Sequence, residues 1–203
     1  MGKGDRLPNE GLLAAALDVM RRNGQPLTKL SGYGRSMMYK LPNDEHVRVR
    51  TCNDHLLIVL ADSTAENAGL NIEGTEWLLI AMPEVERTPG NVLVYLVPTE
   101  VVAEAARESH KAWLKTNPNT KGGNTTWNLW FRTDGTEKPH NNFGHKWKKY
   151  LLNGVGSVSH PLVGGDGTGA TDVKTEVEAA RQRISKAAGV LPEAVKIAID
   201  FGH

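Results

Sequence analysis

The sequence has a single cysteine, Cys52, among its 203 residues. One cysteine cannot form a disulfide within the chain or supply a zinc site built from several cysteines. No apolar run approaches the roughly 20 residues that a membrane-spanning helix needs. The first ten residues lack the apolar core of a secretory signal. These absences favour a cytoplasmic protein of bacterial style over a secreted or membrane protein.

Several enzyme motifs are also missing. The glycine-rich stretch 164–172 lacks the Lys-Ser/Thr pair of a phosphate-binding P-loop. His140 and His145 are five residues apart, a spacing that does not put two imidazoles on one helix face. No serine stands in a nucleophile-elbow motif. The sequence therefore predicts no cofactor and no bound metal ion.

The composition, with 39 % hydrophobic and 23 % charged residues, is that of a soluble globular protein. The net charge of +1 hides an uneven distribution. Residues 105–150 contain nine Lys and Arg against three Asp and Glu, whereas residues 1–104 contain ten against fourteen. A basic middle segment with an acidic flank favours a surface that faces a polyanion. The alternative is a solvated face whose charges balance the rest of the chain.

Hydrophobic periodicity and turn residues predict an α+β fold, with a mixed central sheet flanked by helices. Thr99 is expected to cap the second helix. The predicted elements are helices over 8–24, 99–114, 143–152 and 173–188, and strands near 36–41, 46–52, 55–61, 76–82, 91–97, 126–131 and 194–201.

The chain divides into a core over 1–152, a Gly/Ser-rich linker over 153–172 and a small helix–strand unit over 173–203. Val195, Ile197 and Ile199 alternate with other residues in the last strand. Such a strand either completes the core or adds to the sheet of a partner, either a second copy or another protein. The tail "RISKAAGVLPEAVKIAIDFGH" resembles the endings of small phage and plasmid proteins of unassigned role.

The segment "HVRVRT" (46–51) alternates valines with Arg48 and Arg50. It follows "YKLPNDE" in a predicted hairpin, and "EWLLIAMPE" and "NVLVYLVPTEVV" come after it. Over about residues 8–114 this order resembles the core of the PD-(D/E)xK, or restriction-endonuclease-like, nucleases.

That resemblance implies two carboxylates that hold a divalent metal ion and a lysine that assists the attacking water. In this sequence the position of the aspartate falls near Tyr39 or Lys40, and the Glu-x-Lys pair becomes Arg48 and Arg50. A guanidinium has no lone pair to offer a metal ion. The resemblance therefore implies a degenerate active site with no catalytic residue.

The residues at this degenerate site suit another role. Lys40, Arg48 and Arg50 lie on adjoining predicted strands, and guanidinium forks match phosphate oxygens. Alternatively, the two arginines pair with acidic residues on the solvent face of an ordinary sheet. The acidic residues available for such pairs are Asp44, Glu45 and Asp54.

Four of the five tryptophans lie between residues 111 and 150, interleaved with lysines and arginines. Aromatic rings beside cations are typical of nucleic-acid surfaces, although tryptophans of this kind also form cores. We interpret Trp113 and Trp147 as core residues. Trp127 and Trp130 are three apart on a strand, so one should be more buried than the other. The predicted nucleic-acid-binding residues are Lys40, Arg48, Arg50, Lys121, Trp127, Arg132, Lys146, Lys148 and Lys149.

The sequence thus predicts a non-catalytic protein of a mobile genetic element that either binds nucleic acid, DNA rather than RNA, or has a regulatory role. One alternative is an active metal-dependent endonuclease whose carboxylates are Asp54, Asp62, Glu73 and Glu76. Another is a protein-interaction module that binds no nucleic acid.

Overall fold

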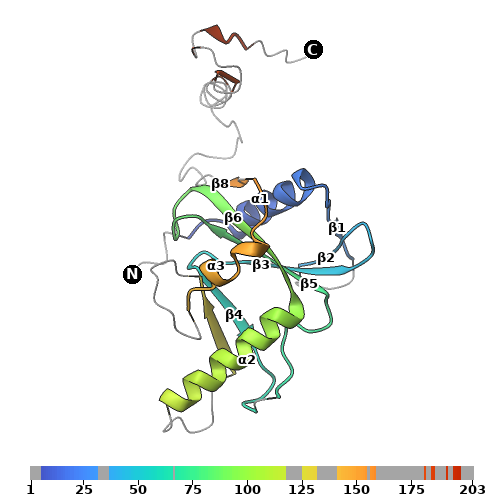
Figure 1. Cartoon of the computed structure of the whole chain (residues 1–203). Coiled ribbons are helices and arrows are strands. Elements are labelled where there is room, and N and C mark those ends of the chain that lie inside the picture. Colours follow the sequence, from blue (N-terminus) through green and yellow to red (C-terminus); the bar gives the residue numbers. More distant parts are fainter. Residues whose placement is uncertain are drawn as a thin grey trace, which may run out of the picture. The chain divides into compact units, whose positions relative to one another are not determined.

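A computed structural model shows a mixed α+β fold (Figure 1). It describes residues 6–31, 37–65, 67–117, 125–131, 141–154 and 156–158, together with residues 181, 184, 185, 191 and 194–197. The chain separates into two units, Met1–Pro161 and Leu162–His203. Within the described residues, no helix has both the length and the apolar character needed to cross a membrane.

The main sheet has six strands in the order β1-β2-β3-β5-β6-β8. Strands β3 and β5 run parallel, and every other neighbouring pair is antiparallel. Because β3 and β5 are parallel, the chain must cross between them, and β4 lies in this crossover. The strands are β1 (Thr28–Lys29), β2 (Met38–Lys40), β3 (His46–Thr51), β5 (Trp77–Pro83), β6 (Gly90–Pro98) and β8 (Gly156–Val158).

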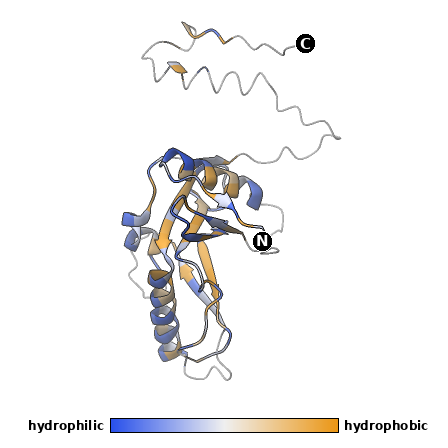
Figure 2. Ribbon diagram, turned by 90° about the vertical axis from the view of Figure 1, so that its right-hand side faces the viewer, coloured by the Kyte–Doolittle hydropathy of each residue, from blue (hydrophilic) through white to orange (hydrophobic). Residues whose placement is uncertain are grey.

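A second sheet pairs β4 (Leu56–Leu60) with β7 (Thr126–Trp130) in antiparallel register. Its buried residues join α2 (Thr99–Thr116) in one hydrophobic cluster on one face of the main sheet. Helix α1 (Asn9–Arg22) contributes to a separate cluster on the other face. The strands are mostly hydrophobic, and the helices carry many hydrophilic residues (Figure 2).

Helix α1 forms because its apolar residues recur at helical spacing and all reach one face. Leu12, Ala16 and Val19 are fully buried against the sheet. Asp18, on the exposed side, binds Arg21 and Arg22 at 2.6 and 2.9 Å in the last turn. Gly24 follows with φ +73°, a left-handed conformation that glycine adopts readily and that completes the turn after the helix.

Two predictions about helices are wrong. Thr99 does not cap α2, because Pro98 occupies the N-cap and Thr99 is the first helical residue. The predicted helix over 143–152 is broken into α3 (Phe143–Lys146) and a 3₁₀ turn, η1 (Lys148–Tyr150). Leu151 and Leu152 instead continue beside β6, where the Leu152 amide donates to the Val94 carbonyl at 2.9 Å. Pairing with the sheet therefore replaces the last helical turn.

The C-terminal predictions are met only in part by described residues. Residues 181, 184 and 185 are helical, within the helix expected over 173–188. Ala194 lies in a 3₁₀ turn and residues 195–197 form no strand, contrary to the strand expected from 194; residues 198–201 lie outside the described chain. Gly156–Val158, within the segment expected to be a linker, form β8 and pair with β6.

Candidate functional site

Arg48 and Arg50 lie on β3, on the face of the main sheet opposite α1. Val47 and Val49 turn toward the α1 cluster and are almost fully buried. The two arginines alternate with them, so they share the other face with their β5 partners Leu78 and Ile80. Both side chains are half-buried. Strand alternation therefore places two guanidinium groups side by side at a partly enclosed position.

These two arginines are poorly compensated. The Arg48 guanidinium donates to the Asn71 carbonyl, but its Nε and the Nε of Arg50 are buried without a hydrogen-bond partner in the described chain. No carboxylate of the described ranges lies within ion-pair distance of either arginine. Burial and the neighbouring charge of Arg48 lower the pKa of Arg50. The pair is thus two like charges with little to balance them.

The three acidic residues that the sequence offers as partners for Arg48 and Arg50 bind other residues instead. Asp44 pairs with Lys40 at 2.6 Å, and Glu45 accepts the indole N–H of Trp77 at 2.7 Å. Asp54 holds Arg6 at 2.7 Å and also accepts from Arg87. The expected alternative, in which Arg48 and Arg50 pair with these three carboxylates, is therefore not what the structure contains.

Lys40 lies on the same sheet face as the arginines. It pairs across the strands with His46, which alternation places on the face of Arg48, and Met38, two residues before Lys40, pairs with Arg48 itself. Its ammonium is already bound to Asp44, and this contact lowers the pKa of Asp44. Both side chains are exposed, so this ion pair is weak and a phosphate can compete for the lysine. Lys40 is an auxiliary cation rather than a free one.

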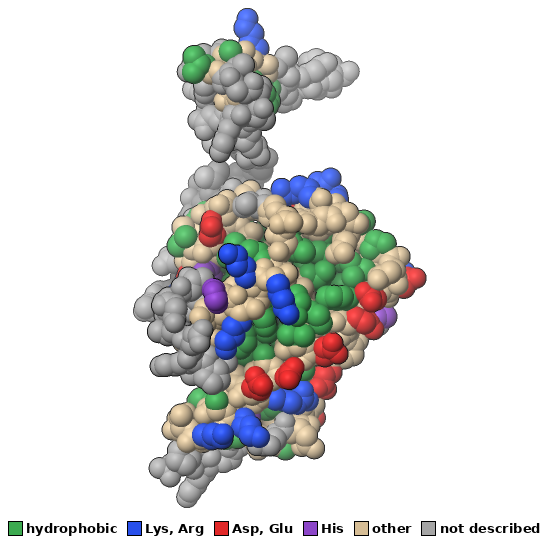
Figure 3. Space-filling view, viewed as in Figure 1, with side chains coloured by type: hydrophobic (Ala, Val, Ile, Leu, Met, Phe, Trp, Pro, Cys, Tyr) green, Lys and Arg blue, Asp and Glu red, His purple; other side chains and the backbone are tan. Residues whose placement is uncertain are grey.

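A second basic surface covers α3 and η1. Lys146, Lys148 and Lys149 are exposed there, and blue side chains gather over these elements in Figure 3. The Lys146 ammonium lies 5.1 Å from the Phe143 ring, and that of Lys149 lies 4.9 Å from the Tyr150 ring. Lys121 and Arg132, also predicted to bind nucleic acid, lie outside the described residues.

Trp127 is a core residue and does not lie on the surface. It is 2 % exposed in the larger hydrophobic cluster, and its ring stacks on His110 with centroids 4.4 Å apart. A side chain so enclosed cannot stack on a base, so Trp127 leaves the set of predicted nucleic-acid contacts. Trp130 is half-buried, in agreement with strand alternation, and Trp147 is a core residue as expected.

The carboxylates of the endonuclease alternative do not assemble. Glu73 pairs with Arg107 at 2.9 Å, and this contact holds the pKa of Glu73 below its ordinary value. Glu76 accepts the His46 amide at 2.6 Å, and Asp62 accepts the Gly69 amide at 3.0 Å. The described part of the chain contains no group of three or more His, Cys, Asp or Glu placed to hold a metal ion.

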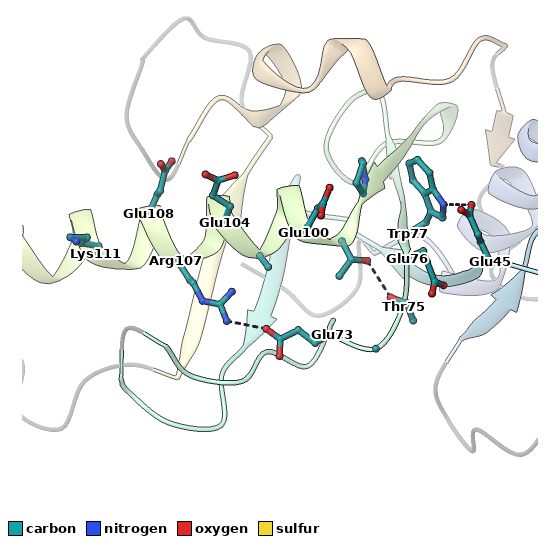
Figure 4. A pocket seen from close by; sticks show the side chains of 14 residues that line it. Glu45, Glu73, Thr75, Glu76, Trp77, Glu100, Glu104, Arg107, Glu108 and Lys111 are labelled. Atoms are coloured by element: carbon teal, nitrogen blue, oxygen red, sulfur yellow. Dashed lines mark hydrogen bonds and ion pairs between the residues drawn. The ribbon is translucent and has the colours of Figure 1, made fainter.

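A large groove, which the sequence interpretation missed, runs beside α2 and the start of β5. It encloses about 990 Å³, and its apolar lining includes Trp77, Pro98 and Ala103. Glutamates from α2 and from the segments before β3 and β5 surround it (Figure 4). The spacing of Glu100, Glu104 and Glu108, four residues apart on a helix, is the sequence signal that could have revealed it.

Comparison with known proteins identifies no relative. The chain matches no protein-family model, no curated protein and no solved structure.

Proposed function

We propose that this protein binds nucleic acid without cleaving it, and that Arg48 and Arg50 form the central phosphate contact. The observation that carries the proposal is the pair of half-buried guanidinium groups with no carboxylate partner in the described chain. Two adjacent cations that are partly removed from water repel each other unless an anion joins them. A phosphate oxygen is an anion that arginine forks bind well.

The surrounding residues support a backbone contact rather than the reading of bases. Lys40 lies on the same face, and its weak surface ion pair can be exchanged for a phosphate contact. Lys146, Lys148 and Lys149 form a second cationic surface on α3 and η1. Cations of this kind supply affinity that is independent of sequence and sensitive to salt. DNA is the proposed ligand.

The proposed origin is a degenerate restriction-endonuclease-like core, in a cytoplasmic regulatory protein of a phage or plasmid. A sheet with α1 on one face and α2 on the other supports this origin, as does the presence of Arg48 and Arg50 where the resemblance implies the Glu-x-Lys pair of the active site. A guanidinium pair binds the substrate phosphate but activates no water through a metal ion. The proposal is therefore binding without hydrolysis.

Fluorescence anisotropy of a labelled DNA duplex over a series of salt concentrations tests this proposal. We expect binding that weakens steeply with salt. In a plot of the logarithm of the binding constant against the logarithm of the salt concentration, each phosphate that the protein neutralises adds about 0.9 to the negative slope. The variant Arg48→Gln/Arg50→Gln should therefore bind less tightly and with a slope reduced by about two. The matched control is Arg21→Gln/Arg22→Gln, which removes the same charge from the exposed end of α1.

Equal affinity for the two double variants would overturn the assignment to Arg48 and Arg50. Absence of DNA binding at low salt would overturn the function itself. Incubation with Mg²⁺ or Mn²⁺ should leave supercoiled plasmid intact. Cleavage that disappears in a Glu73→Gln or Glu76→Gln variant would instead establish the endonuclease alternative.

A further inference from the structure

The groove beside α2 joins a second apolar hollow. The hollow encloses about 400 Å³ and is lined in part by Leu41, Pro42 and Leu96. Glu45 and Trp77 line both spaces, so the two adjoin at these residues, near the start of β5 and the end of β6; the two spaces together are called the channel below. The Trp77 side chain is half-buried, and its indole N–H is held by Glu45. This fixed aromatic ring marks the middle of the apolar floor.

Three glutamates form a row along one side of this channel. Glu100, Glu104 and Glu108 are exposed on α2 and point from the same side of the helix (Figure 4). Like charges four residues apart destabilise a helix. No described cation forms an ion pair with any of the three, and the nearby Arg107 is bound to Glu73 instead. Lys111 also lines the groove, so its described lining holds six glutamates against Arg107 and Lys111, an excess of negative charge beside an apolar floor.

We propose that this channel binds an extended segment of a partner protein in which lysine or arginine alternates with apolar residues. Successive glutamates of the row are about 6 Å apart along the helix axis. Residues i and i+2 of an extended chain are about 6.7 Å apart and point to the same side. Alternate cationic side chains therefore meet the three carboxylates, and where the segment continues past Glu100 its apolar side chains meet Trp77 and Pro98 (Figure 4).

Other occupants match this surface less well. A nucleic acid is repelled by the glutamates that surround the floor. The acidic residues of the described chain do not converge in a group of three or more that could hold a metal ion. The basic surface of a second copy carries its lysines on short helical turns, which do not present cations at alternate positions of an extended chain. Charge and spacing together favour a basic extended peptide.

This inference does not rest on the proposed nucleic-acid contact. The channel and the arginine pair share no residue. A protein partner and DNA can therefore be tested separately, and loss of one activity does not imply loss of the other.

The test uses the full chain and a labelled peptide of about nine residues, in which lysine alternates with leucine. Anisotropy should show saturable binding that weakens with salt. Replacing the lysines with glutamates, or moving them to every fourth position, should weaken binding at least about tenfold. Glu104→Lys/Glu108→Lys should have a similar effect, whereas Glu84→Lys/Glu86→Lys, an equal change of charge at the exposed β5–β6 turn, should not.

Trp77 reports directly on the site. Peptide binding should change the tryptophan fluorescence of the wild type, and Trp77→Phe should remove most of that change. Circular dichroism and thermal unfolding verify that each variant is folded.

Each outcome decides for or against the inference. Equal effects of the two charge-reversal pairs would mean non-specific attraction and would overturn the proposal. Preference for lysines at every fourth position would also overturn it, in favour of a helical ligand. Dimerisation that is abolished by Glu104→Lys/Glu108→Lys, together with no peptide binding, would identify a second copy as the occupant instead.

Discussion

His110 stacks on Trp127 with ring centroids 4.4 Å apart and ring planes inclined by 13°. The Trp113 ring is also nearly parallel to the imidazole, with ring centroids 6.0 Å apart. His110 is 5 % exposed, and its Nε2 has no hydrogen-bond partner among the described residues. The contact fastens α2 to β7 and so joins the helix that lines the channel to the second sheet.

This stack predicts a dependence of stability on pH. Burial lowers the pKa of His110 below its ordinary value of 6.5, although a backbone hydrogen bond to Thr64 opposes the shift. The unfolded chain therefore takes up a proton at higher pH than the folded chain. The contribution of His110 to stability is complete above about pH 6.5 and declines as the pH falls toward its folded-state pKa.

Urea unfolding at several pH values between about 5 and 8 measures this effect. The control is His110→Phe, which keeps an aromatic ring against Trp127 but cannot titrate. The wild type should lose more free energy of unfolding than this variant on acidification. An identical loss in both proteins would show that His110 contributes nothing to the pH dependence.

Much of the fold could be predicted because the local patterns are strong. Helices α1 and α2 and strands β3 to β7 appear close to their expected positions, since apolar residues recur with the period of each element. Strands β1 and β8 have two and three residues, too few to show alternation. The glycines around β8 favoured a linker in the sequence interpretation. In the structure Gly156 belongs to the sheet, and its close approach to α1 explains why a glycine stands there.

The candidate site was only partly predictable from the sequence. Strand alternation placed Arg48 and Arg50 on one face, but the lack of a carboxylate partner for them among the described residues depends on contacts between distant segments. Trp127 was misassigned because a basic neighbourhood in sequence does not reveal which face of a strand is buried. The channel was missed because residues of β5, β6, α2 and the adjoining segments build it jointly.

Replacing Arg50 should stabilise the protein in chloride buffer. The half-buried guanidinium has no carboxylate partner in the part of the chain that the structure describes, so it carries a desolvation cost. Methionine has similar length without charge. Arg50→Met should raise the free energy of unfolding by about 1 kcal/mol. Phosphate, compared with chloride at equal ionic strength, should raise the melting temperature of the wild type but not of this variant. An equal response to phosphate in both would contradict anion binding at Arg50.

Cys52 should be chemically inert in the folded protein. Its side chain is buried, and burial raises the pKa of the thiol to about 12. The nucleophile in thiol chemistry is the thiolate, which is scarce and enclosed here. A chromogenic disulfide reagent at about pH 8 should react slowly in native buffer and rapidly in urea. Fast labelling of the native protein would show that the segment around Cys52 opens readily.

Gly156 should tolerate no side chain, because β8 passes close to α1. A Cβ at this position would lie 3.0 Å from the Cβ of Ala15 and 3.1 Å from its carbonyl oxygen. The helix backbone cannot yield as a flexible side chain can, so Gly156→Ala should cost roughly 1–3 kcal/mol of unfolding free energy in urea titrations. Ser157→Ala, at the neighbouring exposed position, is the control and should change stability by less than about 0.5 kcal/mol. Similar unfolding curves for the two variants would mean that β8 moves away from α1 at little cost, and that the sheet effectively ends at β6.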